Sequence, residues 1–218
     1  MNIIVFGATG GTGRAVVSKL LADGHTVTGF ARDPSKLTAL RGLTIVQGDA
    51  MQPADVARAV PGHDAVVVSL GNSQDPFALM FGARRTTPRD ICEVGTRNII
   101  AAIKAGPPAP MIVVTAYGVG DTRDRLPFMI KLFYRVLLRE HMADKEKQEP
   151  LVKVSGLDFV LVQPVALTDK PAAGKWLVSA SGEVGGQEVS RADLAAFIAK
   201  ELAHARFSRQ TVAFSGAG

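Results

Sequence analysis

The chain has 218 residues, of which 47% are hydrophobic, and this length and composition predict one globular domain over residues 1–218. A single cysteine, Cys92, excludes a disulfide framework, and no Cys and His residues have the spacing of metal ligands, so no metal is expected. The formal net charge of +5 is not concentrated in a Lys/Arg block with interleaved aromatics, which favours a basic surface that attracts a small anion over a nucleic-acid partner.

The first stretch of the chain, MNIIVFGATGGTGR, has the pattern of a strand, a glycine turn and a helix. Asn2–Phe6 is an apolar, β-branched run that predicts a buried strand, and Arg14–Ala22 has helical periodicity. Between them Gly7, Gly10 and Gly13 have the spacing of a dinucleotide-binding loop, in which a pyrophosphate binds to free N–H groups at a helix N-terminus. Thr9 and Thr12 add hydroxyl groups to this loop.

Strand and helix patterns then alternate along the rest of the chain. Further strands are predicted at Thr26–Phe30, Leu43–Gln47, Asp64–Leu70, Met111–Thr115, Phe159–Gln163, Lys175–Ala180 and Thr211–Phe214. Helices are predicted at Pro34–Leu40, Pro53–Val60, Pro88–Ala105, Arg191–Ala205 and from about Leu126 to Val154, the last with an interruption near Pro150. Repeated βα units predict an α/β fold with a doubly wound parallel sheet and small C-terminal substrate-side elements.

The most apolar stretch, Leu126–Met142, is too short for a membrane span and contains Lys131, Arg135 and Arg139. We expect an amphipathic helix in the core or at a dimer interface, so monomer and homodimer both stay open and no stable membrane insertion is expected. No basic region precedes the first apolar run, so no signal peptide is expected and a cytoplasmic location is predicted.

The residues after the second strand bear on which nicotinamide cofactor binds. NAD-specific sites usually place a carboxylate at the end of this strand to hold the ribose 2′-OH. Here the strand ends in Phe30-Ala31-Arg32, and Ser35 and Lys36 follow closely. A guanidinium can bind a 2′-phosphate and stack on adenine, which favours NADP(H) over NAD(H). Asp33 is the counter-argument, since it either reaches the ribose or caps the next helix.

Several segments together resemble a known family. GATGGTGR, FARDPSKL, GDA and HDAVVVSLG are similar to atypical short-chain dehydrogenase/reductases with an NAD(P)H-binding (NmrA-like) domain, a Rossmann fold. The resemblance continues through VVTAYGVGD, ADKEKQEPLVKVSGLDFVLVQP and VSRADLAAFI, and it is closest to the flavin reductase/biliverdin-IXβ reductase-like group. It therefore covers nearly the whole chain.

The resemblance implies roles for residues that match the family's motifs. The phosphate loop corresponds to Gly7, Thr9, Gly10, Gly11, Thr12 and Gly13, and the adenosine 2′-phosphate site corresponds to Arg32 and Ser35. Asp49 and Ala50 correspond to a segment beside the adenine, and Leu70 and Gly71 to one that passes the ribose. At the nicotinamide end, Lys145 corresponds to a residue that reaches the nicotinamide ribose, Pro164 and Val165 to the turn along the nicotinamide, and Thr115 to an active-site serine.

The chain departs from typical short-chain dehydrogenases in its acid–base residues. Those enzymes use Tyr-x-x-x-Lys, whereas Tyr117 and Tyr134 are followed four positions later by Asp121 and Leu138. The candidate catalytic residues are therefore Thr115, Tyr117 and Lys145, with Tyr117 either an acid assisted by Lys145 or a residue that only packs at a strand end. Alcohol–ketone interconversion and sugar epimerisation lose support.

Hydride transfer to a planar acceptor needs no strong protein acid, because charge on a delocalised acceptor can be neutralised from solvent. We therefore expect an NADPH-dependent oxidoreductase that reduces a flavin, quinone or similar planar acceptor. A non-catalytic NADP(H)-sensing protein of the NmrA-like type is the alternative, and an epimerase/dehydratase-like enzyme ranks last. The loop Gly71–Thr87, with Phe77, Met80 and Phe81, is the candidate lip of the acceptor site.

Overall fold

The computed structural model describes residues 1–72, 74, 82, 84–126 and 138–218. Within this part of the chain, one eight-stranded sheet has the order β3-β2-β1-β4-β5-β6-β10-β8. Its strands are β1 (Asn2–Phe6), β2 (Thr26–Ala31), β3 (Leu43–Gln47), β4 (Ala65–Val68), β5 (Met111–Val114), β6 (Phe159–Pro164), β8 (Trp176–Ser179) and β10 (Gln210–Gly216). All neighbouring strands are parallel except β8, which runs antiparallel to β10.

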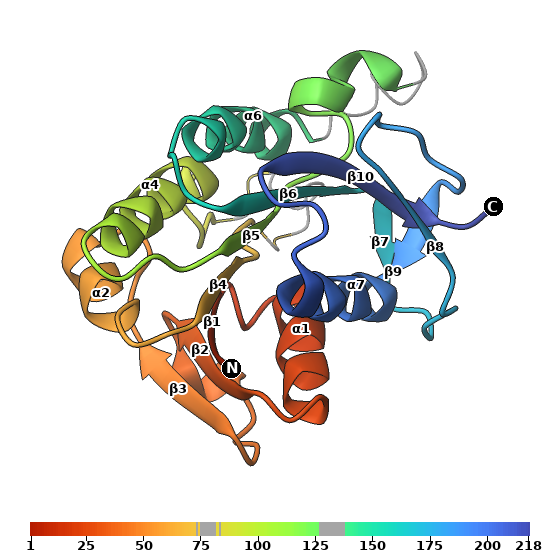
Figure 1. The fold of residues 1–218 in the computed structure, drawn as a ribbon. Coiled ribbons are helices and arrows are strands. Elements are labelled where there is room, and N and C mark those ends of the chain that lie inside the picture. Colours follow the sequence, from red (N-terminus) through yellow and green to blue (C-terminus); the bar gives the residue numbers. More distant parts are fainter. Residues whose placement is uncertain (73, 75–81, 83, 127–137) are drawn as a thin grey trace.

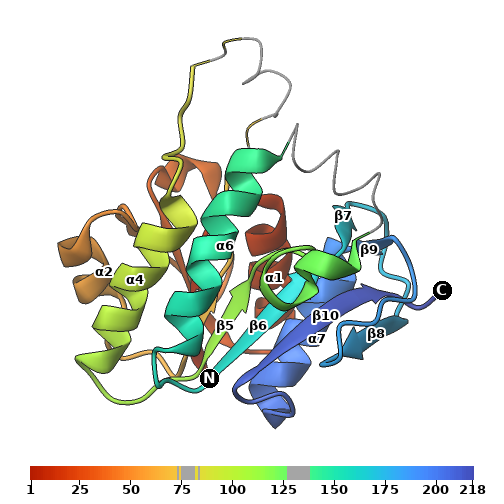
Figure 2. The ribbon, with the colours of Figure 1, turned by 90° about the horizontal axis from the view of Figure 1, so that it is seen from above.

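Helices cover both faces of this sheet (Figure 1). One face carries α1 (Gly11–Ala22) and α7 (Arg191–His204), and the other carries α2 (Pro53–Ala59), α4 (Ile91–Lys104) and α6 (Arg139–Lys153). Figure 2 shows the same two layers from above, with α4 and α6 in front of the sheet. The α/β, doubly wound prediction is therefore confirmed.

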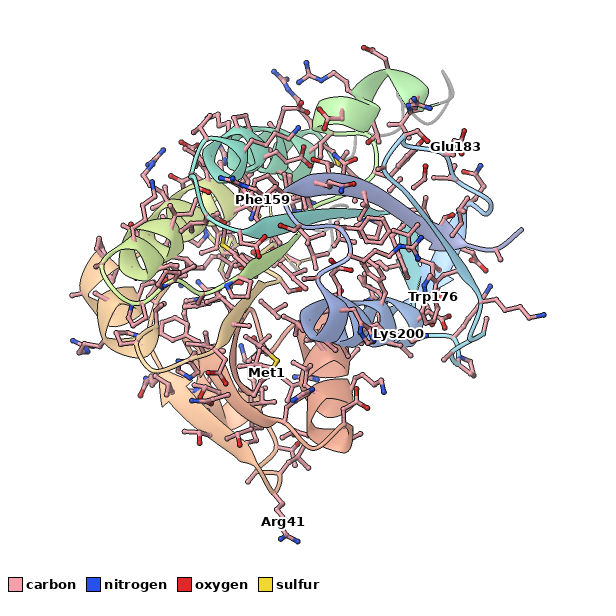
Figure 3. All side chains as sticks on the ribbon, in the orientation of Figure 1. Met1, Arg41, Phe159, Trp176, Glu183 and Lys200 are labelled. Carbon is pink, nitrogen blue, oxygen red and sulfur yellow. The ribbon has the colours of Figure 1, made fainter. Side chains whose placement is uncertain are left out.

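Each helix layer buries its own apolar core against the sheet. The side of α1 and α7 encloses residues such as Val16, Leu194 and Phe214, and the side of α2, α4 and α6 encloses Ile99 and Leu161. Burying one such side chain contributes roughly 1.5–3 kcal/mol, so these two layers fix the strands that present the site. At the rim, Lys200 Nζ lies 4.8 Å from the ring centroid of Trp176 (Figure 3).

The strand order places a topological switch point between β1 and β4. From β1 the chain continues outward to β2 and β3, and then returns to the opposite side of β1 at β4. The carboxyl ends of these parallel strands lie at one edge of the sheet, where the crossovers diverge and leave a crevice for a ligand. Gly7, Arg32 and Ser69 follow β1, β2 and β4 and therefore meet at this edge.

Some predicted elements differ from those observed. The interruption near Pro150 is wrong, because α6 continues to Lys153 with Pro150 inside it. Because Pro150 has no N–H, one backbone hydrogen bond is missing near the end of the helix. Gln148 Nε2 donates to Thr96 Oγ1 at 2.8 Å, and this hydrogen bond connects α6 to α4. The helix predicted from Pro34 shortens to a 3-10 turn, η1 (Pro34–Lys36), and residues 127–137 of the long apolar stretch lie outside the described residues.

Other differences come from contacts between distant segments, which the local sequence pattern does not reveal. Helix α4 begins at Ile91 because the Asp144 carboxylate accepts from the N–H groups of Cys92 and Glu93 at 2.8 and 2.9 Å. The small pair β7 (Ala166–Thr168) and β9 (Glu188–Ser190) and the 3-10 turn η2 (Gly120–Arg125) carry no sequence signal that predicted them. No helix in the described ranges has both the length and the apolarity that a membrane crossing requires.

Candidate functional site

The glycine loop between β1 and α1 is built by close approach of backbones. Gly7 has a φ of +81°, a left-handed conformation that favours glycine, and a Cβ there would lie 2.3 Å from the carbonyl oxygen of Ser69. A Cβ on Gly13 would lie 2.1 Å from the Gly7 oxygen, so α1 can pack on β1 only without one. The Gly10 N–H donates to that same oxygen at 3.0 Å and closes the turn.

The N-terminus of α1 is left open to an anion. Its N-cap residue, Gly10, has no capping side chain, and the first turn holds no acidic residue. The first N–H groups of a helix have no partner within it, so together with the helix dipole they favour a phosphate. A Cβ on Gly10 would meet only the Gly7 oxygen, at 3.4 Å, so a ligand can approach the backbone from outside.

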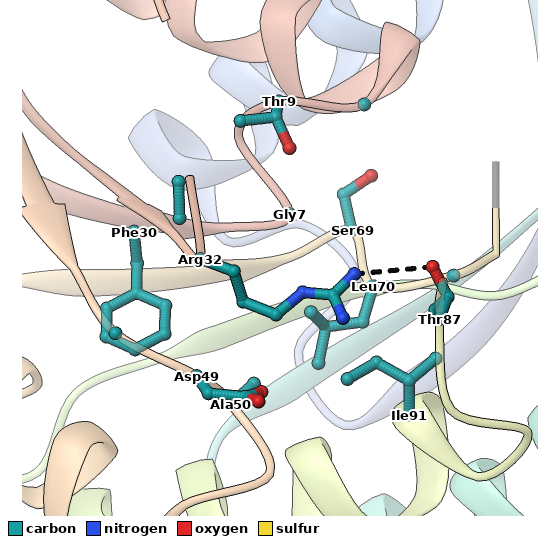
Figure 4. A pocket seen from close by; sticks show the side chains of 14 residues that line it. Gly7, Thr9, Phe30, Arg32, Asp49, Ala50, Ser69, Leu70, Thr87 and Ile91 are labelled. Atoms are coloured by element: carbon teal, nitrogen blue, oxygen red, sulfur yellow. Dashed lines mark hydrogen bonds between the residues drawn. The ribbon is translucent and has the colours of Figure 1, made fainter. Parts of the chain in front are cut away.

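Arg32 extends from the end of β2 across the adjoining cavity (Figure 4). Its guanidinium donates to the Thr86 carbonyl oxygen at 3.0 Å and to Thr87 Oγ1 at 3.3 Å. Its neighbour Asp33 caps η1, where it accepts from the Ser35 hydroxyl at 2.6 Å and from the Ser35 N–H at 3.2 Å. The hydrogen bonds from Ser35 lower the pKa of Asp33, so this carboxylate is already engaged within its own turn.

This cavity, of about 100 Å³, lies at the switch point of the sheet. Eight of the residues assigned by resemblance line it, namely Gly7, Thr9, Gly10, Arg32, Asp49, Ala50, Leu70 and Gly71. Six lining residues were not predicted, namely Phe30, Ala31, Gly48, Ser69, Thr87 and Ile91. Phe30, Ala31 and Ser69 are strand-end residues that the strand order alone would have indicated, whereas Thr87 and Ile91 come from the approach to α4 and carry no pattern.

The remaining cofactor candidates do not line this cavity. Gly11 and Thr12 open α1, and Ser35 stands on η1 with an exposed side chain. Pro164 and Val165 are buried at the end of β6, where the Pro164 carbonyl accepts from the Tyr117 N–H at 2.9 Å and the Val165 N–H donates to the Phe214 carbonyl at 3.0 Å.

Thr115, directly after β5, is buried and its hydroxyl is hydrogen-bonded within the protein. It donates to Glu149 Oε1 at 2.7 Å, and Gln163 Nε2 donates to the same oxygen at 2.8 Å. The other carboxylate oxygen of Glu149 is buried without a partner in the described residues. Burial raises the pKa of Glu149 above its ordinary value, more than the hydrogen bonds from Gln163 and Thr115 lower it.

Tyr117 is part of the apolar core beside α7 and is only 6% exposed. Its phenol donates to the carbonyl oxygen of Gly182 at 3.1 Å. In this structure the hydroxyl is therefore engaged with the backbone of the segment after β8. Its role as an acid stays a prediction, and the observed contact is the one expected of a packing residue.

Lys145, on α6, donates from Nζ to the carbonyl oxygen of Val114 at 3.1 Å, and so lies at the end of β5. It lines a second cavity, of about 120 Å³, together with Asn72, Arg85, Cys92 and His141. Burial raises the pKa of Cys92 to about 12, so this thiol stays protonated near neutral pH. Gly71 borders both cavities, which places the second one directly beside the first.

The expected lip of the acceptor site is the loop Gly71–Thr87. Phe77, Met80 and Phe81 lie outside the described residues. The two ends of their loop are held together, because Gln74 Oε1 accepts from the Thr86 N–H at 2.8 Å and Gln74 Nε2 donates to the Arg84 carbonyl at 3.0 Å. Arg85 forms an ion pair with Glu140 on α6, so the end of the loop is also tied to the second cavity.

Residues 7–205 of the chain match a family described as NAD(P)H-binding. The chain belongs to this NAD(P)H-binding family. Its relatives include the 2-alkyl-3-oxoalkanoate reductase of Shewanella oneidensis, 44% identical over 108 residues that cover 48% of this chain and 25% of that protein. The chain thus matches about a quarter of that relative's length.

Solved structures share the fold over nearly the full length of the chain. The anaerobillin reductase ChuY from Escherichia coli O157:H7 has a TM-score of 0.75 and 26% identity, with 99% of this chain and 97% of that chain covered. A protein assigned as an NADH-flavin reductase from Streptococcus pneumoniae TIGR4 shares the fold, with a TM-score of 0.74, 17% identity and 99% of both chains covered. The predicted family resemblance is confirmed, and the chain is placed among NAD(P)H-dependent oxidoreductases.

Proposed function

We propose that this protein is an NADPH-dependent reductase that transfers a hydride to a flavin, quinone or similar planar acceptor. The observation that carries the proposal is the pair of adjoining cavities that share Gly71. The first is lined by the glycine loop and by Arg32, donors suited to the adenosine and phosphate part of a dinucleotide, and the second is lined by Lys145. A bound nicotinamide supplies the hydride; the chain supplies position and charge.

The preference for NADP(H) rests on the contrast between Arg32 and Asp33. Arg32 presents a guanidinium at the end of β2 and lines the cavity, whereas the carboxylate of Asp33 is engaged with Ser35 and lies 3.6 Å from Lys36 Nζ. A 2′-phosphate therefore meets a cation at this position, and a ribose 2′-OH does not find a free carboxylate.

The residues proposed to act at the nicotinamide end position groups and do not supply a strong acid. Lys145 is placed to hold the nicotinamide ribose and to bring positive charge to an acceptor that becomes negative as it is reduced. The Thr115 hydroxyl donates its hydrogen bond to Glu149. Toward the nicotinamide or acceptor it therefore offers oxygen lone pairs and no O–H donor. An acceptor that takes its proton from solvent suits this arrangement, and a cytoplasmic setting would supply both cofactor and acceptor.

Acceptor-dependent oxidation of NADPH tests the proposal. Purified protein should bind NADPH and deplete its absorbance band when a flavin or a quinone is added, and Lys145→Met should lower kcat by roughly tenfold or more. Lys147→Met, two positions beyond on the exposed face of α6, is the matched control and should leave kcat unchanged. Cofactor binding with no turnover across flavins, quinones and linear tetrapyrroles would contradict the proposal.

A second candidate function, a non-catalytic NADP(H)-sensing protein, is favoured by one observation. Both candidate catalytic hydroxyls, those of Thr115 and Tyr117, are buried and bonded within the protein. Such a protein should capture a partner from its own cells to different extents with NADP⁺ and with NADPH. Equal capture with both forms, together with acceptor-dependent turnover, excludes it.

A further inference from the structure

Arg191 is the first residue of α7, and its side chain reaches the first residue of α1. The two helices pack side by side on one face of the sheet, and both begin at the edge where the glycine loop lies (Figure 1). A Cβ built on Gly11 would lie 2.9 Å from Arg191 Nε and 3.2 Å from its Cδ. The guanidinium therefore occupies the space that a side chain at position 11 would fill.

This contact gives Gly11 a role apart from the turn itself. A Cβ on Gly7 or Gly13 would meet backbone atoms, whereas the three atoms nearest to a Cβ on Gly11 all belong to the Arg191 side chain. Because position 11 is a glycine, the Arg191 guanidinium can contact the first turn of α1. The N–H groups of that turn, which have no capping side chain, favour a phosphate. Arg14, which is nearer in sequence, instead donates to the Lys36 carbonyl at 3.0 Å.

The Arg191 guanidinium is oriented by an ion pair with an exposed carboxylate and not by a buried one. Arg191 Nη1 donates to Asp169 Oδ1 at 2.8 Å, and the Asp169 side chain is 85% exposed while that of Arg191 is 27% exposed. An ion pair with so exposed a carboxylate is weak, so it orients the arginine and can yield to a dianionic ligand. The planar fork of arginine suits bidentate binding of a phosphate oxygen pair.

We propose that Arg191 is a pyrophosphate-binding residue of the cofactor site, closing over the diphosphate from α7 while the N–H groups of α1 bind it from the other side. Arg32 then recognises the 2′-phosphate and Arg191 the diphosphate that NADPH and NADH share. The proposal rests on dinucleotide binding by the family and is independent of which acceptor is reduced. The competing explanation is that Arg191 only ties α1 to the segment that contains Asp169.

The two explanations differ in which ligands lose affinity when Arg191 is replaced. In calorimetric titrations, Arg191→Gln should weaken NADPH and NADH by the same factor, about tenfold or more, because the lost contact is charge-assisted. Binding of 2′-AMP, which has no diphosphate, should be unchanged. Lys200→Gln is the matched control, since it removes a positive charge from the same helix where Lys200 lies beside Trp176 (Figure 3).

Two more variants keep the test decisive if Arg191→Gln folds poorly. Asp169→Asn frees the guanidinium and should tighten NADPH binding, whereas a merely structural ion pair would lower thermal stability and leave NADPH binding no tighter. Arg191→Lys keeps the charge and should retain part of the affinity, with the deficit relative to wild type shrinking in high salt. NADPH affinity within about twofold of wild type in a folded Arg191→Gln protein, or an equal loss for 2′-AMP, would overturn the proposal. Absence of turnover would bear on the proposed reductase function alone.

Discussion

The two proposed ends of the cofactor site satisfy their polar groups in opposite ways. At the proposed adenosine end, the α1 N-terminus has no capping side chain, and Arg32 crosses a cavity, where it donates to the Thr86 carbonyl and the Thr87 hydroxyl. At the proposed nicotinamide end, Thr115 and Gln163 both donate to Glu149, and the Tyr117 phenol donates to Gly182; these side chains line neither of the two adjoining cavities. One end presents groups to a ligand, and the other end pairs its groups with one another.

This contrast suits a site in which cofactor binding and the reaction depend on different groups of residues. Under the proposed function, binding strength comes from the adenosine end, where the backbone and an arginine meet phosphates, and the reaction end supplies the positive charge of Lys145 and side chains that are hydrogen-bonded to one another. Hydride transfer to a delocalised acceptor requires orientation of the two reactants more than it requires a protein acid. The predictions below test this division, beginning with the largest expected effect.

Replacing Gly13 by alanine should damage both the fold and the cofactor site. The added Cβ would lie 2.1 Å from the Gly7 oxygen, which is backbone and cannot rotate away, so α1 must move off β1. We expect the free energy of unfolding to fall by about 3 kcal/mol or more in urea titrations. Gly10→Ala is the matched control: its Cβ meets that oxygen at 3.4 Å, so it should fold normally and weaken only NADPH binding. Equal stability of the two variants would show that the loop is not closely packed.

Arg32→Ala should separate the two cofactors. Loss of the guanidinium should weaken NADPH binding by about 1–3 kcal/mol and leave NADH binding nearly unchanged, because only NADPH carries the 2′-phosphate. Fluorescence titration with both cofactors measures this. Arg41→Ala, which removes an equal charge from an exposed residue at the far tip of the β2–β3 connection (Figure 3), should change neither affinity. Equal losses for NADPH and NADH would refute the 2′-phosphate assignment.

Glu149→Gln should change how stability depends on pH. Because burial raises the pKa of Glu149 above its ordinary value of 4.5, the folded protein favours the protonated carboxyl. This group's contribution to stability is fully present below pH 4.5 and is lost as the pH rises through the folded-state pKa, with a slope of at most about 1.4 kcal/mol per pH unit. Gln cannot ionise, so the variant should lose that slope while its amide oxygen still accepts from Thr115. Parallel stability curves for variant and wild type would show that Glu149 is not desolvated.

The sequence predicted the parts of this molecule that depend on local pattern. The strands that carry the site were visible as apolar runs, and β1 and β3 have the bounds that were expected. The glycine spacing located the phosphate loop because part of its packing is local: a Cβ on Gly13 would meet the oxygen of Gly7, six positions earlier. The sequence predicted that Arg32 directly follows the second strand, and in the structure it lines the cavity at that strand end.

Features that arise from contacts between distant segments were not predictable in the same way. The pairing of Thr115 with Glu149 joins residues 34 positions apart, and the pairing of Arg32 with Thr87 joins residues 55 apart. A glutamate in the middle of a polar helical stretch gave no sign that its carboxyl would be buried. Arg191 likewise was read as part of a family motif, and only the packing of α7 on α1 brings it to the glycine loop.

Tyr117→Phe gives the smallest expected effect and decides between the two interpretations of the phenol. Removing the hydroxyl takes a donor from the buried Gly182 carbonyl, so the free energy of unfolding should fall by about 1 kcal/mol and kcat should be unchanged. Thr122→Val, which removes another buried hydroxyl, one that accepts from the Gly118 N–H, is the matched control and should behave alike. A fall in kcat of about a hundredfold in Tyr117→Phe alone would instead make Tyr117 a proton donor. Its hydroxyl would then have to leave Gly182 when cofactor and acceptor bind, and the nicotinamide end would no longer be the internally paired surface seen here.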